Sequence, residues 1–357
     1  MLTLLLLAIG VIMVLSSSFA RAYAQGKSPT YYFVRQAGFA VAGVVGMILF
    51  SNVRMATYRR WSLLLLGVSI FLLAIVWIPH IGVVGGGARR WLSLGFTTFQ
   101  PSEIAKIAVV LFFSSMICTY KDQMQTIRYG VVPFMVITGG IVILLMLEPH
   151  LSASIIIMAL AIVMMFVGGI KLSYLLIGMG GAGALLLIAG KFVPYVHKRI
   201  VSWRDPFADT SAAGYQIVQS LYSIGSGGFL GLGLGQSRQK YLYLPEEHND
   251  CIFAVICEEL GLVGACVIML VFALLILRGF WIALHARDRF GALLVVGFMT
   301  LTGLQTFLNI AVVTGLVPAT GISLPFFSYG GTALLCQLAE MGIVLSVSRQ
   351  MPAPENG

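Results

Sequence analysis

Long apolar runs dominate this sequence and restrict the folds that it can adopt. Ten stretches approach the roughly 20 apolar residues that an α-helix needs to cross a bilayer. Their predicted limits are 1–20, 33–50, 62–79, 102–119, 130–148, 151–169, 173–190, 251–277, 291–313 and 331–348. Only 10% of the residues are charged, which excludes an ordinary water-soluble domain. We therefore expect an all-α membrane protein, a polytopic bundle of about ten transmembrane helices.

The connections between the runs predict the topology. Alternate short connections carry cations such as Arg59, Lys121 and Arg287, and cationic loops of this kind stay in the cytoplasm. Both termini are therefore expected in the cytoplasm. The first run has no basic residues ahead of it and is longer than a usual signal-peptide core, so we interpret it as a retained span. We expect residues 1–348 to form one integral membrane domain, followed by a short tail at 349–357.

Three connections on the opposite side are expected as outer loops: 80–101, 191–250 and 314–330. The first two carry cations that the topology rule does not explain, namely Arg89, Arg90, Lys198, Arg199, Arg238 and Lys240. A cationic surface there suits an anionic substrate or lipid headgroup. The alternative is a general attraction to anionic phospholipids. The formal charge of +9 does not indicate nucleic acid, because the chain has no basic tail.

The most polar stretch is Tyr241–Asp250, which leads directly into an apolar run. It places Glu246, Glu247, His248 and Asp250 at the mouth of a predicted membrane helix. Hydrated titratable groups at a membrane boundary can carry chemistry, and we select Asp250 as the candidate catalytic carboxylate. Asn and Asp are also favoured helix N-caps, so a purely structural role as a cap is an equal alternative.

Charged residues also fall inside the apolar runs, where an unpaired charge is costly. Glu103 and Lys106 are three residues apart, so they share a helix face and can pair. They are candidates either for substrate contact or for mutual neutralisation. Glu258 and Glu259 lie in the eighth run. At about 100° per residue neither lies on the helix face of Asp250, so we expect them to serve helix packing.

The glycine-rich segment 225–235 invites interpretation as a phosphate-binding loop. It lacks the Gly-Lys-Ser/Thr ending of that motif and the strand that precedes it. Close backbone packing or a hinge is the better interpretation. Residues 215–224, just before it, have apolar positions at helical spacing over a length too short to cross a bilayer. This pattern predicts an interfacial or re-entrant helix within 205–240.

Four blocks of the sequence resemble a known family. They are Gly87–Gly95 with Gln100–Lys106, Gly214–Ser220 with Gly235–Lys240, Leu244–Asp250 with Glu258–Gly261, and Pro318–Gly331. In this order, and in a ten-span frame, they resemble the SEDS family (shape, elongation, division and sporulation), the bacterial cell-wall polymerases that include RodA and FtsW. Asn309–Gly315 resembles the FtsW and SpoVE branch more than RodA. The chain departs from the usual family pattern at Asn249, Ser323 and the turn 149–152.

The resemblance implies peptidoglycan glycosyltransfer at the outer face of the bacterial cytoplasmic membrane. The substrate would be lipid II, a disaccharide-pentapeptide on undecaprenyl diphosphate, polymerised into glycan strands. Asp250 matches the family's essential aspartate and would be the general base that takes the proton of the acceptor hydroxyl, with inversion at the donor carbon. Diphosphate is a good leaving group, so one carboxylate suffices where glycoside hydrolysis uses two.

The resemblance also implies roles for the other candidates. Substrate binding would fall to Arg89, Arg90, Lys198, Arg199, Arg238, Lys240, His248, Glu103 and Lys106, with the last two shaping the cavity. A divalent cation, Mg²⁺ or Mn²⁺, could share the diphosphate charge, and no organic cofactor is expected. The expected partner is a class B penicillin-binding protein, a transpeptidase. The alternative functions are a flippase or transporter for lipid II, or a membrane scaffold for that transpeptidase.

Overall fold

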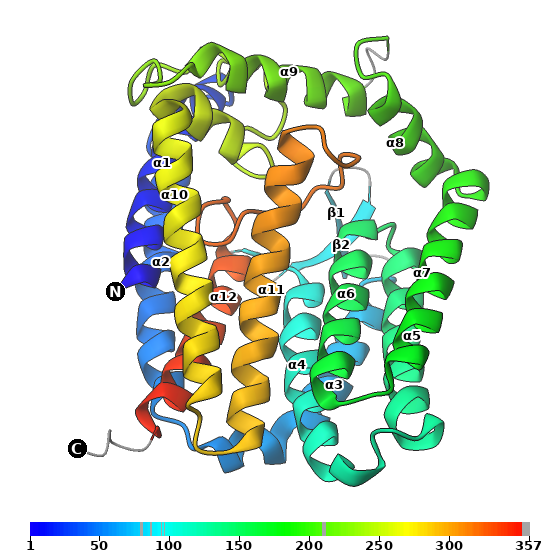
Figure 1. Ribbon diagram of the computed structural model, residues 1–357. Coiled ribbons are helices and arrows are strands. Elements are labelled where there is room, and N and C mark those ends of the chain that lie inside the picture. The colour runs from blue at the N-terminus through cyan, green and yellow to red at the C-terminus, as the bar shows by residue number, and fades with distance from the viewer. Residues whose placement is uncertain (79–80, 86–87, 94, 96, 209–211, 352–357) are drawn as a thin grey trace. The chain divides into compact units, whose positions relative to one another are not determined.

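The computed structural model describes residues 1–78, 81–85, 88–93, 95, 97–208 and 212–351. Figure 1 shows that these residues form mainly helices. The long apolar helices are α1 (Leu2–Ala24), α2 (Tyr31–Ser51), α3 (Met55–Ile75), α4 (Pro101–Thr119), α5 (Val132–Leu147), α6 (Leu151–Gly168), α7 (Leu172–Phe192), α10 (Ile252–Leu284), α11 (Arg289–Val313) and α12 (Gly331–Arg349). Two further helices are α8 (Pro194–Arg204) and α9 (Ala212–Gly227), and a short 3₁₀-helix and a short π-helix cover Lys121–Gln123 and Ile127–Val131.

The expected helical membrane fold is confirmed. Among the described residues, nine helices are long and apolar enough to cross a membrane, and α7 contributes a shorter apolar stretch at Leu172–Ala184. Every predicted run has a helical counterpart. The largest shift is in the third, where α3 covers Met55–Ile75 instead of 62–79. The helix includes Arg59 and Arg60, because arginine is a good helix former even where the apolar pattern has ended.

The connection 80–101 was expected as a loop but contains a three-stranded antiparallel sheet. Its strands are β1 (Gly82–Gly85), β2 (Ala88–Ser93) and β3 (Thr98–Phe99), in the order β1-β2-β3. Along β2 the side chains alternate, with Ala88 and Leu92 buried and Arg89 and Ser93 exposed, which is the period of a half-buried strand. Gly87, which opens the first family block, lies outside the described residues.

The chain divides into two compact units. Unit 1 comprises residues 1–42, 185–275 and 302–334, and unit 2 comprises 43–184, 276–301 and 335–357. In unit 2, α4 is buried along most of its length and packs against α3 and α6. Asp250 lies in unit 1, whereas Glu103, Lys106 and the sheet lie in unit 2. Of the expected tail at 349–357, residues 352–357 lie outside the described residues.

The long connection 191–250 holds two packed helices, α8 and α9. The helix expected within 205–240 is α9. The polar helix α8 was not predicted, although Val196, Ile200 and Trp203 recur at helical spacing. It begins with Pro194 at the first helical turn, where the missing N–H of proline costs nothing.

The glycine-rich segment packs closely against α10, as one of the two interpretations predicted. α10 is interrupted at Gly261, whose φ of 67° and ψ of −172° are not helical. A Cβ atom on Gly227 would lie 2.0 Å from the Cys257 carbonyl oxygen, and one on Gly231 would lie 2.2 Å from that of Glu259. Only glycine therefore fits at these two positions.

Candidate functional site

The segment that carries Asp250 is a compact run of turns ahead of α10. The amides of Asn249 and Cys251 both donate to the Glu246 carbonyl, at 3.0 and 3.2 Å. The side-chain amide of Asn249 donates to the Glu246 carboxylate at 2.6 Å. These local bonds hold the chain in a tight turn, and Asp250 remains partly exposed two residues before the helix begins at Ile252.

Three successive carbonyl groups of this segment accept hydrogen bonds from distant parts of unit 1. The Tyr329 amide donates to the His248 carbonyl at 2.8 Å. The Ser328 hydroxyl donates to the Asn249 carbonyl at 2.8 Å. The Asn309 side-chain amide donates to the Asp250 carbonyl at 2.8 Å. The backbone under the candidate carboxylate is therefore fixed at three consecutive residues.

The loop between α11 and α12 lies against the Asp250 carboxylate. Gly321 has a left-handed φ of 70°, and a Cβ atom built on it would lie 3.1 Å from Asp250 Oδ2. Two residues earlier in this loop, the Ala319 carbonyl accepts a hydrogen bond from Arg199 on α8. A cation is thereby anchored to the loop that borders the carboxylate. Lys198, its neighbour on α8, is exposed.

Glu247 and His248, both buried, take part in an ion pair and an aromatic cluster beside Asp250. Arg21 of α1 donates from Nε and from a terminal nitrogen to the two oxygens of Glu247, each at 2.8 Å. Burial opposes ionisation of Glu247, but His248 and Arg21 outweigh it and hold the pKa of this carboxyl below its usual value. His248 Nδ1 lies 3.8 Å from Glu247 Oε1, which is too long for a hydrogen bond. The lowered pKa of Glu247 therefore depends mainly on Arg21. The His248 ring packs 4.8 Å from the Tyr32 ring, between centroids.

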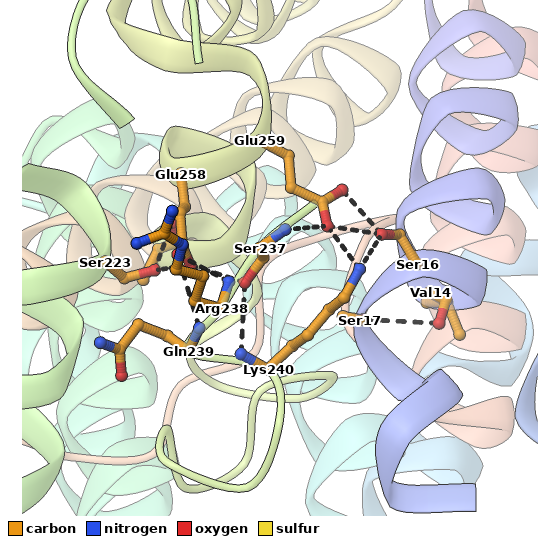
Figure 2. Close-up of polar contacts among 11 residues, drawn as sticks. Val14, Ser16, Ser17, Ser223, Ser237, Arg238, Gln239, Lys240, Glu258 and Glu259 are labelled. Carbon is orange, nitrogen blue, oxygen red and sulfur yellow. Dashed lines mark hydrogen bonds and ion pairs between the residues drawn. The ribbon is translucent and has the colours of Figure 1, made fainter. Parts of the chain in front are cut away.

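Glu258 and Glu259 anchor the segment that precedes the Asp250 turn (Figure 2). Glu258 accepts hydrogen bonds from the Ser223 hydroxyl at 2.9 Å, the Ser237 hydroxyl at 2.6 Å and the Arg238 amide at 2.8 Å. Glu259 accepts from the Ser16 hydroxyl at 2.7 Å and the Lys240 ammonium at 2.9 Å. Both carboxylates are buried, and each has several charge-assisted partners, as a buried charge requires.

This network decides which cations of the segment can reach a ligand. Lys240 is 3% exposed and is paired with Glu259, so its charge is already neutralised. The contact from Arg238 to Glu258 uses its backbone amide, and its side chain is exposed. Of the two cations selected from this stretch, Arg238 is therefore the one whose charge faces outward.

Unit 2 holds a second group of predicted site residues. Lys106 Nζ lies 2.9 and 2.8 Å from the two oxygens of Glu103, and both side chains are buried. Glu340 on α12 is also buried and interacts electrostatically with both of them. Glu340 was not among the residues predicted from the sequence, although a lone acid in the last apolar run is a signal of the same kind.

The turn between α5 and α6 places two buried titratable groups beside Arg90. Arg90 of β2 donates to the Glu148 carbonyl at 3.3 Å and also to the Pro149 carbonyl. Burial raises the pKa of Glu148 to about 8, against the opposing effect of Arg90. Burial, with Arg90 and Lys106 nearby, lowers the pKa of His150 to about 3. Both side chains are therefore neutral near pH 7, and Arg90 is tied to the turn, while Arg89 is exposed.

Comparison with known proteins identifies the family. A family model described as "Cell cycle protein", which covers FtsW, RodA and SpoVE, matches residues 1–352. The chain belongs to the FtsW/RodA/SpoVE family. Stage V sporulation protein E of Bacillus subtilis is 42% identical over 351 residues, which are 97% of this chain and 95% of that protein. The probable peptidoglycan glycosyltransferase FtsW of Geobacter sp. strain M18 is 39% identical over 354 residues, 98% of this chain and 96% of that one.

Solved structures agree with this membership of the FtsW/RodA/SpoVE family. One similar chain comes from a structure described as the structural coordination of polymerization and crosslinking by a peptidoglycan synthase complex. It has a TM-score of 0.79 at 27% identity and covers 97% of this chain and 96% of its own length. RodA of Thermus thermophilus has a TM-score of 0.71 at 26% identity, covering 98% and 97%. The expected family is confirmed, and the similarity to SpoVE and FtsW agrees with the expected branch.

The residues selected for an FtsW/RodA/SpoVE site fall into two groups. Unit 1 contains Asp250, His248, Lys198, Arg199, Arg238 and Lys240, and unit 2 contains Arg89, Arg90, Glu103 and Lys106. Within the described residues, no three His, Cys, Asp or Glu side chains converge as metal ligands. Mg²⁺ usually binds through one or two carboxylates together with water and substrate phosphates, so the expected divalent cation stays a prediction.

Proposed function

We propose that this protein is a peptidoglycan glycosyltransferase that polymerises lipid II at the outer face of the cytoplasmic membrane, with Asp250 as general base. Relatives across nearly the whole chain are named as probable peptidoglycan glycosyltransferases. The observation that carries the role of Asp250 is its placement. It is a partly exposed carboxylate on a backbone fixed at three consecutive residues.

The proposed reaction is a single displacement. Asp250 takes the proton of the acceptor sugar's 4-hydroxyl as that oxygen attacks the anomeric carbon of the donor. The bond between this carbon and the diphosphate oxygen breaks, and undecaprenyl diphosphate leaves with the electron pair. Attack from the face opposite the leaving group inverts the configuration. The carboxylate must be ionised and within hydrogen-bond reach of the hydroxyl, which a partly exposed and fixed side chain allows.

The diphosphate needs cations where its negative charge increases. Lys198 and Arg238, both exposed in unit 1, are suited to this role. Lys240 is not, because Glu259 neutralises it. Arg199 remains a candidate next to the loop that borders Asp250. In this proposal the membrane orientation is the one predicted from the loop charges, with both termini in the cytoplasm.

The proposed partner is a class B penicillin-binding protein that crosslinks the new strands. The similarity to a chain of a peptidoglycan synthase complex supports such a partner. A pure scaffold would need its partner for any polymerisation, and a flippase would move lipid II without polymerising it. If the protein is itself the enzyme, the purified chain makes glycan strands from lipid II, and the partner increases this activity.

The test compares Asp250→Asn with Asp205→Asn, an exposed acid of the same unit, in lipid II polymerisation by detergent-solubilised protein. Loss of the base lowers the rate at least about 100-fold, whereas Asp205→Asn behaves as the unchanged protein. Thermal denaturation of both variants shows whether they are folded. Full polymerisation by Asp250→Asn contradicts the role of Asp250. Absence of strands from the unchanged chain, with and without the partner, contradicts the polymerase itself.

A further inference from the structure

One buried amide joins the Asp250 backbone to the loop that borders its carboxylate. The side-chain nitrogen of Asn309 on α11 donates to the Asp250 carbonyl at 2.8 Å and to the Ile322 carbonyl at 2.6 Å. Ile322 follows Gly321, which lies against the carboxylate. Asn309 is 1% exposed, and its bond to Ile322 is buried while its bond to Asp250 is partly buried. The amide therefore fixes the separation between the Asp250 backbone and the surface that its side chain meets.

A second buried side chain fixes the residue before Asp250. The Ser328 hydroxyl donates to the Asn249 carbonyl at 2.8 Å and accepts from the Leu324 amide at 2.7 Å. The Ser328 backbone is in turn held by Gln36 of α2, whose side-chain amide donates to the Ser328 carbonyl at 3.2 Å. The Ser328 hydroxyl thus links the Asp250 segment to the loop between α11 and α12, which is itself anchored to α2.

We infer that Asn309 and Ser328 are positioning residues that hold the Asp250 carboxylate in place for proton transfer. The inference rests on the proposed function. Both side chains act through backbone carbonyls, so they set where the base lies without joining the reaction. A displacement of about 1 Å in a reacting group can cost about 100-fold in rate. Removing either donor also leaves a backbone carbonyl of the segment without its partner, which allows the segment to shift.

The test uses Asn309→Leu and Ser328→Ala in the full-length protein, with Thr306→Val as matched control. Thr306 is buried on the same helix as Asn309, but within the described residues its hydroxyl bonds only to the carbonyl of Thr302 one turn earlier. We expect kcat for lipid II polymerisation to fall about 10- to 100-fold in the two variants. KM stays within about threefold, because substrate contacts are unchanged. The control keeps its kcat.

A purely structural role would lower the melting temperature and the folded fraction and leave kcat per folded molecule unchanged. That result, or a kcat for Asn309→Leu equal to that of the control, overturns the inference. Failure of the proposed function is a separate outcome, seen either as a fully active Asp250→Asn or as an unchanged protein that makes no strands. A positioning role therefore requires two results together. Asp250→Asn is inactive, and Asn309→Leu and Ser328→Ala have a lowered kcat with a nearly unchanged KM.

A different observation concerns the apolar surface of the segment Gly228–Leu234. This segment is not helical, yet Phe229 is 75% exposed, Leu230 82% and Leu234 58%. A run of large apolar side chains facing outward is typical of a surface that contacts lipid or another protein.

The backbone of this segment is bonded to the interrupted part of α10. The amides of Leu232 and Gly233 donate to the carbonyls of Glu258 and Glu259, at 2.9 and 3.0 Å. In return, the amides of Leu262 and Val263 donate to the carbonyls of Gly228 and Phe229, at 2.9 and 3.1 Å. The exchange satisfies groups that the interruption at Gly261 would leave without partners. Backbone groups near the hydrocarbon region need partners within the protein, and these four bonds supply them on the side of the segment that faces α10.

The part of α10 to which Gly228–Leu234 is bonded lies at a boundary of the hydrocarbon core. Residues 262–277 contain no charged side chain, and at 1.5 Å per residue they extend about 24 Å, most of the core's roughly 30 Å. At the far end of this run, Arg278 stacks on Trp281 at 4.0 Å from the ring centroid, as interfacial residues do. The bonded partners of Gly228–Leu234 therefore lie at the opposite boundary.

We propose that the side chains of Phe229, Leu230 and Leu234 insert among the phospholipid acyl chains of one leaflet, while the backbone of the segment stays at the boundary. A nitroxide on Leu230→Cys, or on Phe229→Cys, in the full-length protein in nanodiscs of phosphatidylcholine and phosphatidylglycerol tests this. Cys118 and Cys266, the native cysteines that are not buried, are replaced by serine. Collision rates with oxygen, which concentrates in lipid, and with a water-soluble nickel chelate are compared with those at Leu270→Cys and Ser28→Cys.

Leu270 is an exposed apolar position of α10, and Ser28 is an exposed polar position between α1 and α2. We expect both loop labels to behave like the label at Leu270, with frequent oxygen collisions and few nickel collisions. Frequent nickel collisions, as expected at Ser28, would overturn the proposal in favour of an aqueous loop. Few collisions with either reagent would overturn it in favour of a protein contact.

Discussion

At the scale of single residues, Gly321 determines how closely the loop approaches the candidate base. A methyl group there would lie 3.1 Å from Asp250 Oδ2 and would have to adopt a left-handed φ of 70°. We predict that Gly321→Ala lowers kcat by about 10-fold, because crowding moves the carboxylate from its productive place. Lipid II polymerisation by purified protein, normalised to folded molecules, measures the effect.

The control for backbone strain is Gly235→Ala. Gly235 has a left-handed φ of 80°, but nothing lies within 4 Å of its would-be Cβ. Both alanines therefore carry a conformational cost of about 1–2 kcal/mol, and only the one at Gly321 meets the carboxylate. Equal kcat values for the two variants would mean that the contact with Asp250 does not matter.

Local sequence indicated Asp250 but not the residues that hold it. Asp250 stands out because its neighbours are polar and the run that follows is apolar. Asn309 and Ser328 are 59 and 79 residues away from the carbonyls that they bind, and no local pattern links such positions. Lys240 illustrates the converse, because a lysine in a predicted outer loop looks available until its pairing with buried Glu259 is known.

At the scale of elements, the glycine-rich segment and the interrupted helix α10 form one structure. A Cβ atom on Gly231 would lie 2.2 Å from the Glu259 carbonyl oxygen, whereas one on Gly228 meets nothing within 4 Å. Both have left-handed φ values, 79° and 55°. We predict that Gly231→Ala destabilises the protein by about 3 kcal/mol or more, since strain and the loss of bonds between backbones add.

The comparison variant Gly228→Ala carries only the cost of its left-handed backbone, about 1–2 kcal/mol. Thermal denaturation in detergent should place the melting temperature of Gly231→Ala well below that of Gly228→Ala. Indistinguishable melting temperatures would show that the segment separates from α10 at little cost.

The apolar pattern predicted the helices better than the connections between them. A membrane helix must satisfy its own backbone in lipid, so an apolar run of sufficient length has few alternatives. No such constraint applies to the polar helix α8 or to the sheet. In the sheet, the alternation that predicts β2 covers only Ala88–Ser93, and the pairing of β2 with β1 and β3 depends on neighbours that hydropathy does not reveal.

At the scale of the whole molecule, composition fixed the class of protein and left the internal division open. The high apolar content requires a membrane as solvent. The two compact units draw their residues from three separate stretches of chain each, and such a division depends on tertiary contacts. It also separates the selected cations, with Arg89 and Arg90 in one unit and Lys198 and Arg199 in the other.

The free energy of unfolding should depend on pH through Glu148 and His150, with opposite signs. The pKa of Glu148 is raised from 4.5 to about 8, so the folded state keeps a proton that the unfolded state has lost. Stability from this group is present below pH 4.5 and is lost as the pH rises toward 8. The pKa of His150 is lowered from 6.5 to about 3. Stability from this group is present above pH 6.5 and is lost as the pH falls toward 3.

The effects of Glu148 and His150 oppose each other between pH 4.5 and 6.5. Of these two groups, only Glu148 contributes to the loss of stability from pH 6.5 to 8. There the slope reaches about 1.4 kcal/mol per pH unit. We predict that Glu148→Gln removes this loss, because an amide stays neutral at every pH. Melting temperatures in detergent from pH 5 to pH 8 should show the variant gaining on the unchanged protein as the pH rises. Asp122→Asn, which alters an exposed carboxyl of the same unit, controls for the change in net charge. If the difference between Glu148→Gln and the unchanged protein is constant across this range, Glu148 is ionised in the folded state and its burial is relieved by water.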